Sequence, residues 1–377
     1  MIKIGFECCN AIKSCQPTGI VFTFLGAVNS ISKEKEISSF IFYPWFFDKK
    51  YFGFKQKDVP IKYLFVCDKL SEKRFFRWWY DKSLISQIGK QDLHILHSFL
   101  GLLPLEKRCK YVITIHDLGY LVNKEWGSHI SKIFIERLKR SIKNSDKIIA
   151  VSEATKNDIL KFFSIKEEKI EVVYWGIDEI FRKIKDEEEL EKFRFNKRLP
   201  SKFILSVGVF HPRKNPLGII QAFKILRSKY KIDQELVLIG RDCMNGKIHR
   251  FVKNEGLSSI VKYYGYVKRE ELVYFYNLAD VFLFPSFYEG FGLPVLESMR
   301  CGCSVVCSDR GGLKEIGGNC AYLVDPDSPS SIARGVYQVV SDRFLKSTLI
   351  EKGYKFSKRF SWDNYREKMC SLYREIL

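Results

Sequence analysis

Short apolar runs alternate with amphipathic segments along most of the chain. Residues 130–142 are one such segment, in which apolar side chains recur at helical spacing and form one stripe. Alternation of strand-like and helix-like segments is typical of a parallel sheet wrapped by helices. In the first half of the chain, the runs predicted as strands are 2–6, 37–43, 61–67, 93–97, 111–116, 147–151 and 170–174.

This rhythm stops at residues 183–200 and then resumes. The stretch is densely charged, contains Glu187-Glu188-Glu189 and ends at Pro200. We therefore predict a first domain over 1–182, a linker region over 183–200, a second domain over 201–356 and a C-terminal helix over 357–377. A solvated helix at the start of the second domain is an alternative reading of the charged stretch. In the second half, the predicted strands are 203–209, 236–240, 261–265, 281–284 and 304–308.

Composition and charge set limits on the class of protein. The chain has 377 residues, 46% of them hydrophobic and 28% charged, which suits two globular domains. No apolar stretch approaches the ~18 residues of a membrane-spanning helix, and the amino terminus has no signal-peptide pattern. The 11 cysteines form no zinc-type pair and are interpreted as reduced cysteines of a cytosolic protein. The net charge of +19 favours an acidic partner, which leaves nucleic acid, an anionic membrane surface and phosphorylated substrates open.

Residues 284–302 combine a strand end, a glycine loop and a helix start. The apolar run 281–284 ends at Pro285, and the loop that follows contains Gly290 and Gly292. Such a turn presents backbone N–H groups and the positive end of a helix dipole to an anion. Glu289 in the loop and Glu297 in the helix add carboxylates, which accept hydrogen bonds from sugar hydroxyls. One loop with both kinds of group indicates a sugar–phosphate ligand.

A second loop adds cations, and a histidine follows another strand. Arg213 and Lys214 come directly after the strand predicted at 203–209. They can neutralise a leaving diphosphate as a glycosidic bond breaks, and arginine can bind phosphate with a fork of hydrogen bonds. A surface basic pair at a helix start is the alternative. His116 ends the strand 111–116, at the sheet edge where open α/β folds place ligands.

These stretches resemble one family, the retaining GT-B glycosyltransferases of family 4 (glycosyl transferases group 1). The run from Glu289 to Glu297 resembles the family's pair of glutamates with seven residues between them. The segments 207–215 and 114–118 resemble its Pro-Arg-Lys-Asn loop and its His-Asp segment. Shorter similarities lie at Val151-Ser-Glu-Ala-Thr155, Trp175-Gly-Ile-Asp178 and Val324-Asp-Pro326. The resemblance runs from about residue 93 to residue 326.

The resemblance implies a fold and a reaction. The expected fold is α/β of the GT-B type, with two doubly wound Rossmann-like domains facing a cleft and a C-terminal helix crossing back to the first domain. The expected enzyme is a metal-independent retaining hexosyltransferase without a cofactor. It would move a mannose- or glucose-type hexose from a GDP- or UDP-linked donor to a growing surface polysaccharide or lipid-linked glycan. The expected location is the cytoplasm, with peripheral contact to the cytoplasmic face of the inner membrane left open.

The resemblance also implies roles for individual residues. Catalytic roles go to Glu289, His116, Arg213 and Lys214, and no residue is expected to bind a metal. Acceptor binding is expected at Gly19 and His116. In the donor site, Glu289 would face the sugar and Glu297 the ribose hydroxyls. The full set expected to bind the donor is Arg213, Lys214, Glu289, Gly290, Phe291, Gly292, Leu293 and Glu297.

The chain departs from the family pattern at several positions. Val209 stands where family members carry arginine, His211 where glutamate is common, and Lys314 where a proline is usual. These changes leave the donor's identity open. Near the amino terminus, Thr18-Gly19-Ile20 fits the expected glycine-rich loop, but the polar residues beyond it are missing.

Alternatives from other classes remain. Residues 73–80 are basic and aromatic together, which suits a membrane surface, a single-stranded nucleic-acid site or a helix with its aromatic side chains in the core. A nucleotide-sugar 2-epimerase would share the fold. A nucleic-acid-binding protein would explain the charge but not Glu289 and Glu297, so no nucleic-acid partner is expected. A non-catalytic membrane scaffold built on 73–80 is the third alternative.

Overall fold

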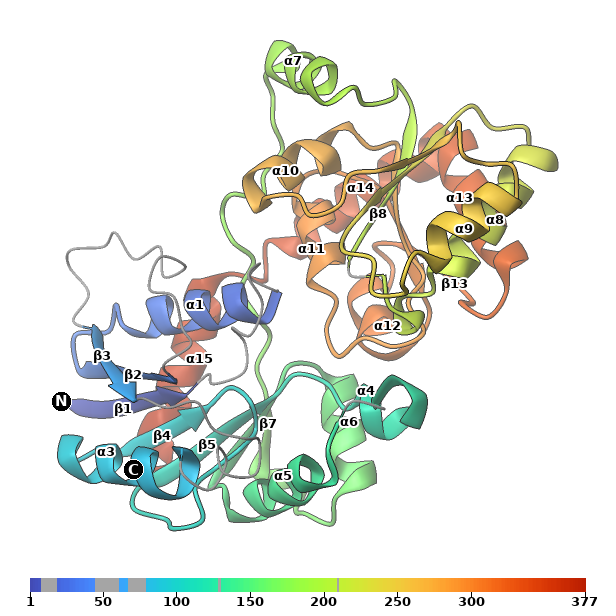
Figure 1. Cartoon of the computed structure of the whole chain (residues 1–377). Coiled ribbons are helices and arrows are strands. Elements are labelled where there is room, and N and C mark those ends of the chain that lie inside the picture. The colour runs from blue at the N-terminus through green and yellow to red at the C-terminus, as the bar shows by residue number, and fades with distance from the viewer. Residues whose placement is uncertain (8–18, 45–60, 67–78, 128–129, 209) are drawn as a thin grey trace. The chain divides into compact units, whose positions relative to one another are not determined.

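The computed structural model describes residues 1–7, 19–44, 61–66, 79–127, 130–208 and 210–377. The chain forms two compact units (Figure 1). The first contains residues 1–176 together with 360–377, and the second contains 177–359. Thr18 of the expected glycine-rich loop and residues 73–78 of the basic aromatic segment lie outside the described residues.

The first unit is built on a seven-stranded parallel sheet of order β3-β2-β1-β4-β5-β6-β7. All the strands predicted in this half of the chain are present. The order reverses between β1 and β4, which is the position where open α/β sheets bind ligands beyond their strand ends. The strands are β1 (Ile2–Glu7), β2 (Ile37–Pro44), β3 (Ile61–Val66), β4 (Ile95–Ser98), β5 (Lys110–Ile115), β6 (Lys147–Ala150) and β7 (Ile170–Val172).

Helices cover this sheet as the apolar stripes predict. In α5, Leu138 and Ile142 of the predicted stripe are buried, and Ser131 begins the helix by accepting a hydrogen bond from the Phe134 N–H at 3.2 Å. The helices are α1 (Gly19–Ile31), α3 (Ile85–Gln91), α4 (Gly119–Val122), α5 (Lys132–Asn144), α6 (Glu153–Phe162) and α15 (Trp362–Glu375). Single turns are η2 (Trp79–Leu84), η3 (Lys124–Gly127) and η4 (Glu167–Lys169).

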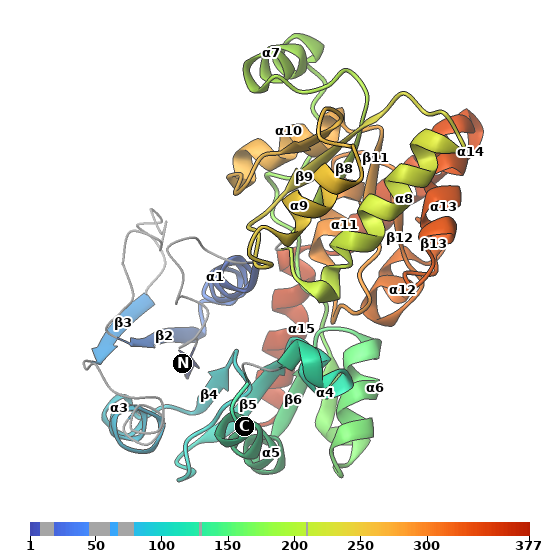
Figure 2. The same ribbon diagram turned by 45° about the vertical axis from the view of Figure 1, so that its right-hand side comes forward.

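The last helix of the sequence, α15, belongs to the first unit. It packs against α1, and Figures 1 and 2 both show the two helices side by side. Tyr365, Met369 and Leu372, which recur at helical spacing along α15, are buried. The predicted return of the C-terminal helix to the first domain is therefore confirmed.

The second unit contains a six-stranded parallel sheet of order β10-β9-β8-β11-β12-β13. Here the order reverses between β8 and β11, so the loops that follow these two strands leave the sheet at neighbouring points. The strands are β8 (Phe203–Val207), β9 (Glu235–Ile239), β10 (Val261–Tyr263), β11 (Val281–Phe284), β12 (Val305–Ser308) and β13 (Tyr322–Val324).

Alternate side chains of these strands serve two cores, one on each face. Ile204, Leu238 and Leu283 belong to the core shared with α8, α9 and α13, whereas Phe282 packs edge-on against Tyr276 of α10. Figure 2 shows α8 and α13 on one face of the sheet and α10 and α11 on the other. The helices are α7 (Glu187–Lys197), α8 (Pro216–Ser228), α9 (Lys247–Asn254), α10 (Arg269–Leu278), α11 (Leu293–Arg300), α12 (Gly311–Gly317), α13 (Pro329–Ser341) and α14 (Arg343–Ser357), with the turn η5 (Pro212–Lys214).

The division between the units differs from the predicted linker over 183–200. The second unit begins at Ile177, and residues 187–197 of the expected linker form α7 within it. Asp186 begins this helix by accepting a hydrogen bond from the Glu189 N–H at 3.0 Å. Phe193 then stacks on Tyr274 of α10 with ring centroids 4.4 Å apart. The charged stretch is thus the solvated helix that the sequence left as an alternative.

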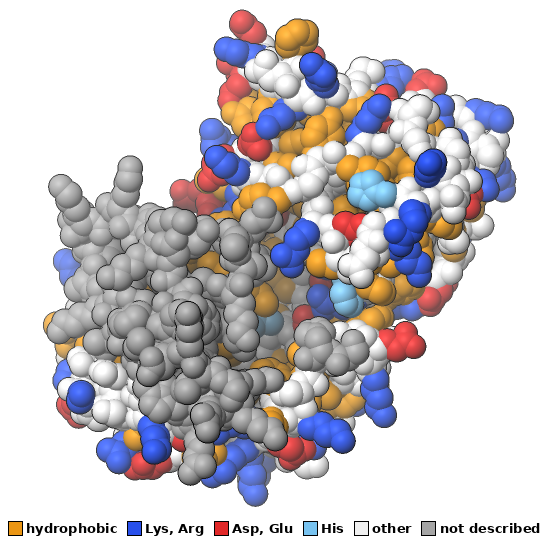
Figure 3. Space-filling model, viewed as in Figure 1, with side chains coloured by type: hydrophobic (Ala, Val, Ile, Leu, Met, Phe, Trp, Pro, Cys, Tyr) orange, Lys and Arg blue, Asp and Glu red, His pale blue; other side chains and the backbone are white. Residues whose placement is uncertain are grey.

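Surface charge in the second unit is mixed. On the face shown in Figure 3, Lys and Arg side chains lie among Asp and Glu side chains. Within the described part of the chain, no helix is both long and apolar enough to cross a membrane.

Candidate functional site

Lys214 and Glu289 meet in the second unit, at the reversal point of its sheet. Lys214 ends the turn η5 after β8, and Glu289 lies in the loop after β11. The Lys214 Nζ is 2.5 Å from the Glu289 Oε1 and 4.9 Å from the centroid of the Phe284 ring. The Glu289 residue is only 8% exposed, so this ion pair is largely shielded from water. The structure therefore joins the two loops that the sequence singled out.

Arg213 ties the same two loops through its backbone. Its carbonyl accepts a hydrogen bond from the Phe287 N–H at 2.9 Å. His211, which replaces a common family glutamate, begins the turn: its Nδ1 accepts a hydrogen bond from the Arg213 N–H at 3.2 Å. The bond assigns the lone pair to Nδ1, because a backbone N–H can only donate. Local bonds thus fix the backbone from which the Arg213 and Lys214 side chains project.

The path of the loop from Gly290 to Leu293 depends on glycines, which have no side chain. Gly292 precedes α11 with φ of +109°, a conformation that favours glycine. Gly312, at the start of α12, donates its N–H to the Glu289 carbonyl at 3.0 Å, and a Cβ on Gly312 would lie 2.5 Å from the Gly290 carbonyl oxygen. Phe291 is buried, and Leu293 is the first residue of α11. The start of α12 therefore supports the loop that carries Glu289.

Glu297 faces a different set of partners. The Tyr276 hydroxyl donates to its Oε2 at 3.4 Å, and the Arg269 guanidinium lies 3.9 Å from its Oε1. Arg269 in turn pairs with Asp178 at 2.9 Å. Burial raises the pKa of the Glu297 carboxyl to about 7, although Arg269 and the Tyr276 hydrogen bond act in the opposite direction. The two glutamates of the motif thus occupy separate environments in one unit.

Asn215 links three loops, and the sequence analysis gave it no role. Its Nδ2 donates to the Pro326 carbonyl at 2.7 Å and to the Pro285 carbonyl at 3.3 Å. Its Oδ1 accepts a hydrogen bond from the Gly218 N–H at 3.2 Å and so begins α8. An Asn before a Pro at the first helical position is a helix-start signal that could have predicted the last bond. The bonds to the other loops could not be read from spacing.

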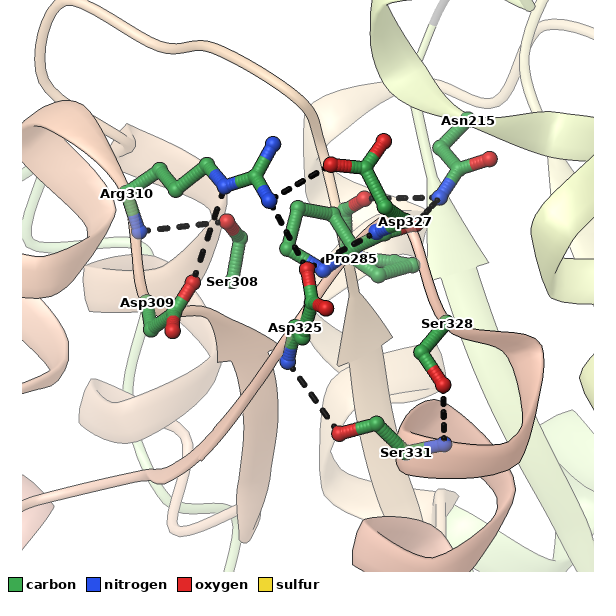
Figure 4. A network of polar contacts seen from close by, with 10 residues as sticks. Asn215, Pro285, Ser308, Asp309, Arg310, Asp325, Asp327, Ser328 and Ser331 are labelled. Carbon is green, nitrogen blue, oxygen red and sulfur yellow. Dashed lines mark hydrogen bonds and ion pairs between the residues drawn. The ribbon is translucent and has the colours of Figure 1, made fainter.

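Arg310 connects the loops that follow β12 and β13. The sequence analysis gave this residue no role either. Its guanidinium lies between the carboxylates of Asp325 and Asp327, at 2.8 Å and 2.6 Å (Figure 4). The Asp325 N–H bonds to the Ser331 hydroxyl at 3.2 Å, which joins the loop after β13 to α13. These bonds connect the loops after β12 and β13 beside the site.

His116 lies at the carboxyl end of β5 in the first unit. Its Nε2 is 2.7 Å from the Phe99 carbonyl oxygen, which can only accept, so Nε2 carries the proton and Nδ1 the lone pair. Burial lowers the pKa of His116, and the Phe99 hydrogen bond and Asp117 oppose this shift. The Asp117 carboxylate accepts a hydrogen bond from the Gly119 N–H, at the start of α4, at 3.0 Å. The ring is therefore held neutral, with an acceptor at Nδ1.

His97 of β4 is fully buried between β5 and α15. Its Nδ1 is 2.6 Å from the Tyr373 hydroxyl and its Nε2 is 2.7 Å from the Thr114 hydroxyl. Burial lowers its pKa to about 3, and the neighbouring His116 acts in the same direction. His97 is therefore a neutral hydrogen-bonding link inside the unit.

The amino-terminal side of the first unit contains a residue with no counterpart in the sequence predictions. Glu7 ends β1 at the reversal point of the sheet and is fully buried. The Ser98 hydroxyl donates to its carboxylate at 2.8 Å and the Tyr80 hydroxyl at 3.0 Å. Gly19, the expected acceptor-binding residue, is exposed as the first residue of α1. Of the basic aromatic segment, the described side chain of Tyr80 is buried, as the core alternative predicts for that residue.

Among the described residues, no group of three or more His, Cys, Asp and Glu side chains could hold a metal ion. The cation that pairs with Glu289 is the Lys214 ammonium group. Metal independence stays a prediction.

Two family models match the sequence around these sites. Residues 187–356 match the family described as "Glycosyl transferases group 1", and residues 47–180 match "Glycosyltransferase Family 4". The chain belongs to the GT-B glycosyltransferases of family 4. Both loops that meet at Lys214 and Glu289 fall within the first of these matches.

Curated relatives of this family-4 glycosyltransferase include mannosyltransferases of Escherichia coli. The chain is 28% identical over 265 residues to "O-antigen chain mannosyltransferase B" of Escherichia coli, a match that covers 70% of each protein. It is 30% identical over 261 residues to the "Serotype-specific mannosyltransferase WbdA" of Escherichia coli. That second match covers 68% of this chain but 32% of WbdA.

Solved structures share the fold of this family-4 glycosyltransferase. Sucrose-phosphate synthase from Thermosynechococcus elongatus aligns with a TM-score of 0.79 and 19% identity over 100% of this chain and 99% of its own. Anabaena Alr3699/HepE in complex with UDP-glucose aligns with a TM-score of 0.78 and 16% identity over 100% of both chains. The predicted GT-B fold class is thus confirmed.

Proposed function

We propose that this family-4 glycosyltransferase moves a hexose from a nucleotide-diphosphate sugar to a growing surface polysaccharide or lipid-linked glycan. Mannose is the first choice of hexose, because the O-antigen and serotype-specific relatives are named mannosyltransferases. GDP-mannose is the corresponding first donor to test. UDP-glucose is the second, because HepE of the same fold is described with it.

The observation that carries this proposal is the Lys214–Glu289 pair at the reversal point of the second sheet. A diphosphate needs cations, and a hexose needs hydrogen-bond acceptors for its hydroxyls. The 2.5 Å contact places one group of each kind side by side. The loop from Gly290 to Leu293 adds the backbone N–H groups that begin α11, with the helix dipole favouring a phosphate there.

We assign charge neutralisation to the side chains of Arg213, Lys214 and Glu289. When the bond between the anomeric carbon and the phosphate oxygen breaks, negative charge grows on the diphosphate and positive charge on the sugar. Arg213 and Lys214 would stabilise the first, and the Glu289 carboxylate the second. Because these cations supply the stabilisation that a metal ion gives in other transferases, we propose a metal-independent enzyme.

Retention of configuration follows if the acceptor attacks from the face that the phosphate leaves. The new bond then joins the acceptor oxygen to the anomeric carbon, and the acceptor's hydroxyl proton passes to the departing phosphate oxygen. No protein nucleophile is required in this scheme. Glu289 remains a stabilising carboxylate throughout.

His116 and Glu297 would position the donor and acceptor. The neutral His116 ring offers Nδ1 as an acceptor for a sugar hydroxyl. Glu297, as a carboxylate, would accept hydrogen bonds from the ribose hydroxyls. Gly19 is proposed to lie along the acceptor path. We place the reaction in the cytoplasm, with the lipid-linked acceptor drawing the enzyme to the inner membrane face.

A transfer assay tests the proposal. The purified chain is incubated with GDP-mannose, UDP-glucose or ADP-glucose and a synthetic glycan primer, with and without EDTA. Products are followed by mass spectrometry, and the anomeric configuration of the new linkage by NMR. We expect transfer with retained configuration that is insensitive to EDTA. Lys214→Ala and Glu289→Ala should each lower kcat by about 10²- to 10³-fold.

The chain provides a matched control for these variants. Lys224 and Glu255 form another ion pair of 2.5 Å in the same unit, and their alanine variants should keep full activity. Absence of transfer from every donor would contradict the proposal. A nucleotide sugar epimerised at carbon 2, with no transfer, would show that the 2-epimerase alternative is correct.

A further inference from the structure

Trp175 lies at the centre of an aromatic cluster in the first unit that the proposed reaction does not use. The residue is 2% exposed and belongs to the Trp175-Gly-Ile-Asp178 segment. Its ring is nearly parallel to that of His116, with centroids 5.5 Å apart and an interplanar angle of 16°. It is also stacked on Phe99, whose carbonyl binds His116, at 5.9 Å and 25°. Trp175 therefore contacts both the ring of His116 and the residue that orients it.

The same indole contacts the C-terminal helix. Tyr365 of α15 stacks on Trp175 at 5.2 Å and 26°, and Trp362 packs on it at 6.2 Å. Offset aromatic pairs of this kind fix the relative planes of the rings. Trp175 thus contacts both the end of β5, which precedes it in the sequence, and α15, which follows it.

Trp362 in turn has no room to move. A Cβ on Gly26 of α1 would lie 2.2 Å from the Trp362 ring, and a Cβ on Gly176 would lie 2.6 Å from it. The indole therefore occupies the volume that side chains at both positions would need. At the other end of α15, Tyr373 binds His97, which binds Thr114 two residues before His116. Both ends of α15 are tied to the carboxyl end of β5.

We propose that Trp175 is a positioning residue for His116, and that it makes the orientation of the His116 ring depend on the docking of α15. The backbone bond to Phe99 fixes one nitrogen of the ring but leaves rotation about that bond. The stack on Trp175 fixes the ring plane and hence the direction of the Nδ1 lone pair. The inference rests on the proposed function only in assuming that this lone pair meets the substrate.

Histidine NMR on the full chain tests the geometry independently of activity. The chain has 6 histidines, so the His116 signals can be assigned from one His116→Asn spectrum. In the wild type we expect the Nε2–H tautomer. In Trp175→Leu, the ring should lose this single tautomer, and its pKa should rise towards the ordinary value of about 6.5 as water reaches it. Asp117 and His97, the titratable groups that act on His116, are unchanged in this variant.

Kinetics supply the second readout. Trp175→Leu should lower kcat at least about tenfold, with the donor KM changed by less than about threefold, because a tilted ring affects alignment more than binding. Trp175→Phe keeps an aromatic plane and should restore most of the loss. The control is Phe40→Leu, which removes a buried ring from β2, separated from β5 by β1 and β4 in the sheet.

The proposal is overturned if Trp175→Leu leaves the tautomer and titration of His116 as in the wild type. It is also overturned if Phe40→Leu, at equal loss of melting temperature, lowers kcat as much. Should Trp175→Leu fail to fold, Tyr365→Leu removes the other stacked ring and is expected to give the same shifts. Full activity of His116→Ala would instead contradict the proposed role of His116, while the NMR result would still decide the role of Trp175.

Discussion

At the scale of single residues, the two glutamates of the motif differ in what surrounds them. Glu289 is paired with a cation at 2.5 Å, whereas Glu297 has the Tyr276 hydroxyl at 3.4 Å and the Arg269 guanidinium at 3.9 Å. At Glu297, burial with distant partners favours the neutral form of the carboxyl group. The motif therefore holds two carboxyl groups with different chemistry at a spacing of eight residues.

The raised pKa of Glu297 predicts a stability effect of definite sign. Its carboxyl shifts from 4.5 to about 7, so the folded state binds this proton more tightly than the unfolded state does. The resulting stability is complete below pH 4.5 and is lost as the pH rises through 7. The upper estimate of the loss is ~3 kcal/mol. Urea unfolding of the wild type and of Glu297→Gln at several pH values measures the difference.

Glu297→Gln cannot titrate, so the difference between the two unfolding curves isolates this group. A constant difference from pH 4.5 to pH 8 would contradict the assignment. Donor affinity should change in the opposite direction, because only the carboxylate accepts from both ribose hydroxyls. Wild-type affinity should rise through pH 7, and that of Glu297→Gln should stay flat.

At the scale of elements, the site is a set of strand-end loops that hold one another. Asn215 binds the loops after β11 and β13 and begins α8, and Arg310 joins the loops after β12 and β13. A residue that bonds several loops at once does more than cap a helix. Its loss should therefore cost more than the loss of a simple cap.

Asn215→Asp separates the two roles of Asn215. Aspartate can still accept the Gly218 N–H, but it cannot donate to the carbonyls of Pro285 and Pro326. Two buried carbonyls would then lose their donor and face a carboxylate oxygen, so we expect a loss of about 2–3 kcal/mol in the free energy of unfolding. The control is Ser328→Ala, which removes only the cap of α13 and should cost about 1 kcal/mol. Equal losses in the two variants would contradict the bridging role.

Sequence patterns predicted elements better than their connections. Strand β11, the glycine loop and α11 were predictable because Pro285 and Pro294 restrict the backbone locally, whereas Gly292 permits the positive φ that the turn requires. That Lys214 and Glu289 belong to one site was expected only through the family resemblance, since the two residues are 75 positions apart. Glu7 and Arg310 gave no signal, because their partners come from strands and loops that only the folded topology brings together. The charged run at 183–200 could not be assigned to a linker or to the solvated helix α7 from its sequence, because both expose charged side chains to water.

At the scale of the whole molecule, the two units differ in whether one continuous segment of the chain or two separate segments form them. The second unit is continuous, from 177 to 359, whereas the first needs residues 1–176 and 360–377. In the first unit, Trp362 and Tyr365 of α15 complete the core around Trp175. A continuous segment with its own core can fold alone, and a split one depends on both of its parts.

Fragments of the chain test this difference. The fragment 177–359 should fold cooperatively on its own, with circular dichroism of an α/β protein and a sharp melting transition. The fragment 1–176 lacks α15 and should show exposed apolar surface and no sharp transition. Addition of a peptide covering 360–377 should restore part of the transition. A cooperative fold of 1–176 alone would contradict the role given to α15.

The loops joined by Lys214 and Glu289 are proposed to bind the diphosphate and sugar of a nucleotide-sugar donor. Titration calorimetry of the full chain with GDP-mannose and with UDP-glucose measures this binding directly. We predict binding of at least one donor, weakened about 100-fold or more in the Lys214→Ala/Glu289→Ala double variant and unchanged in the Lys224→Ala/Glu255→Ala control. No binding of either donor, or equal binding by the two double variants, would contradict the account.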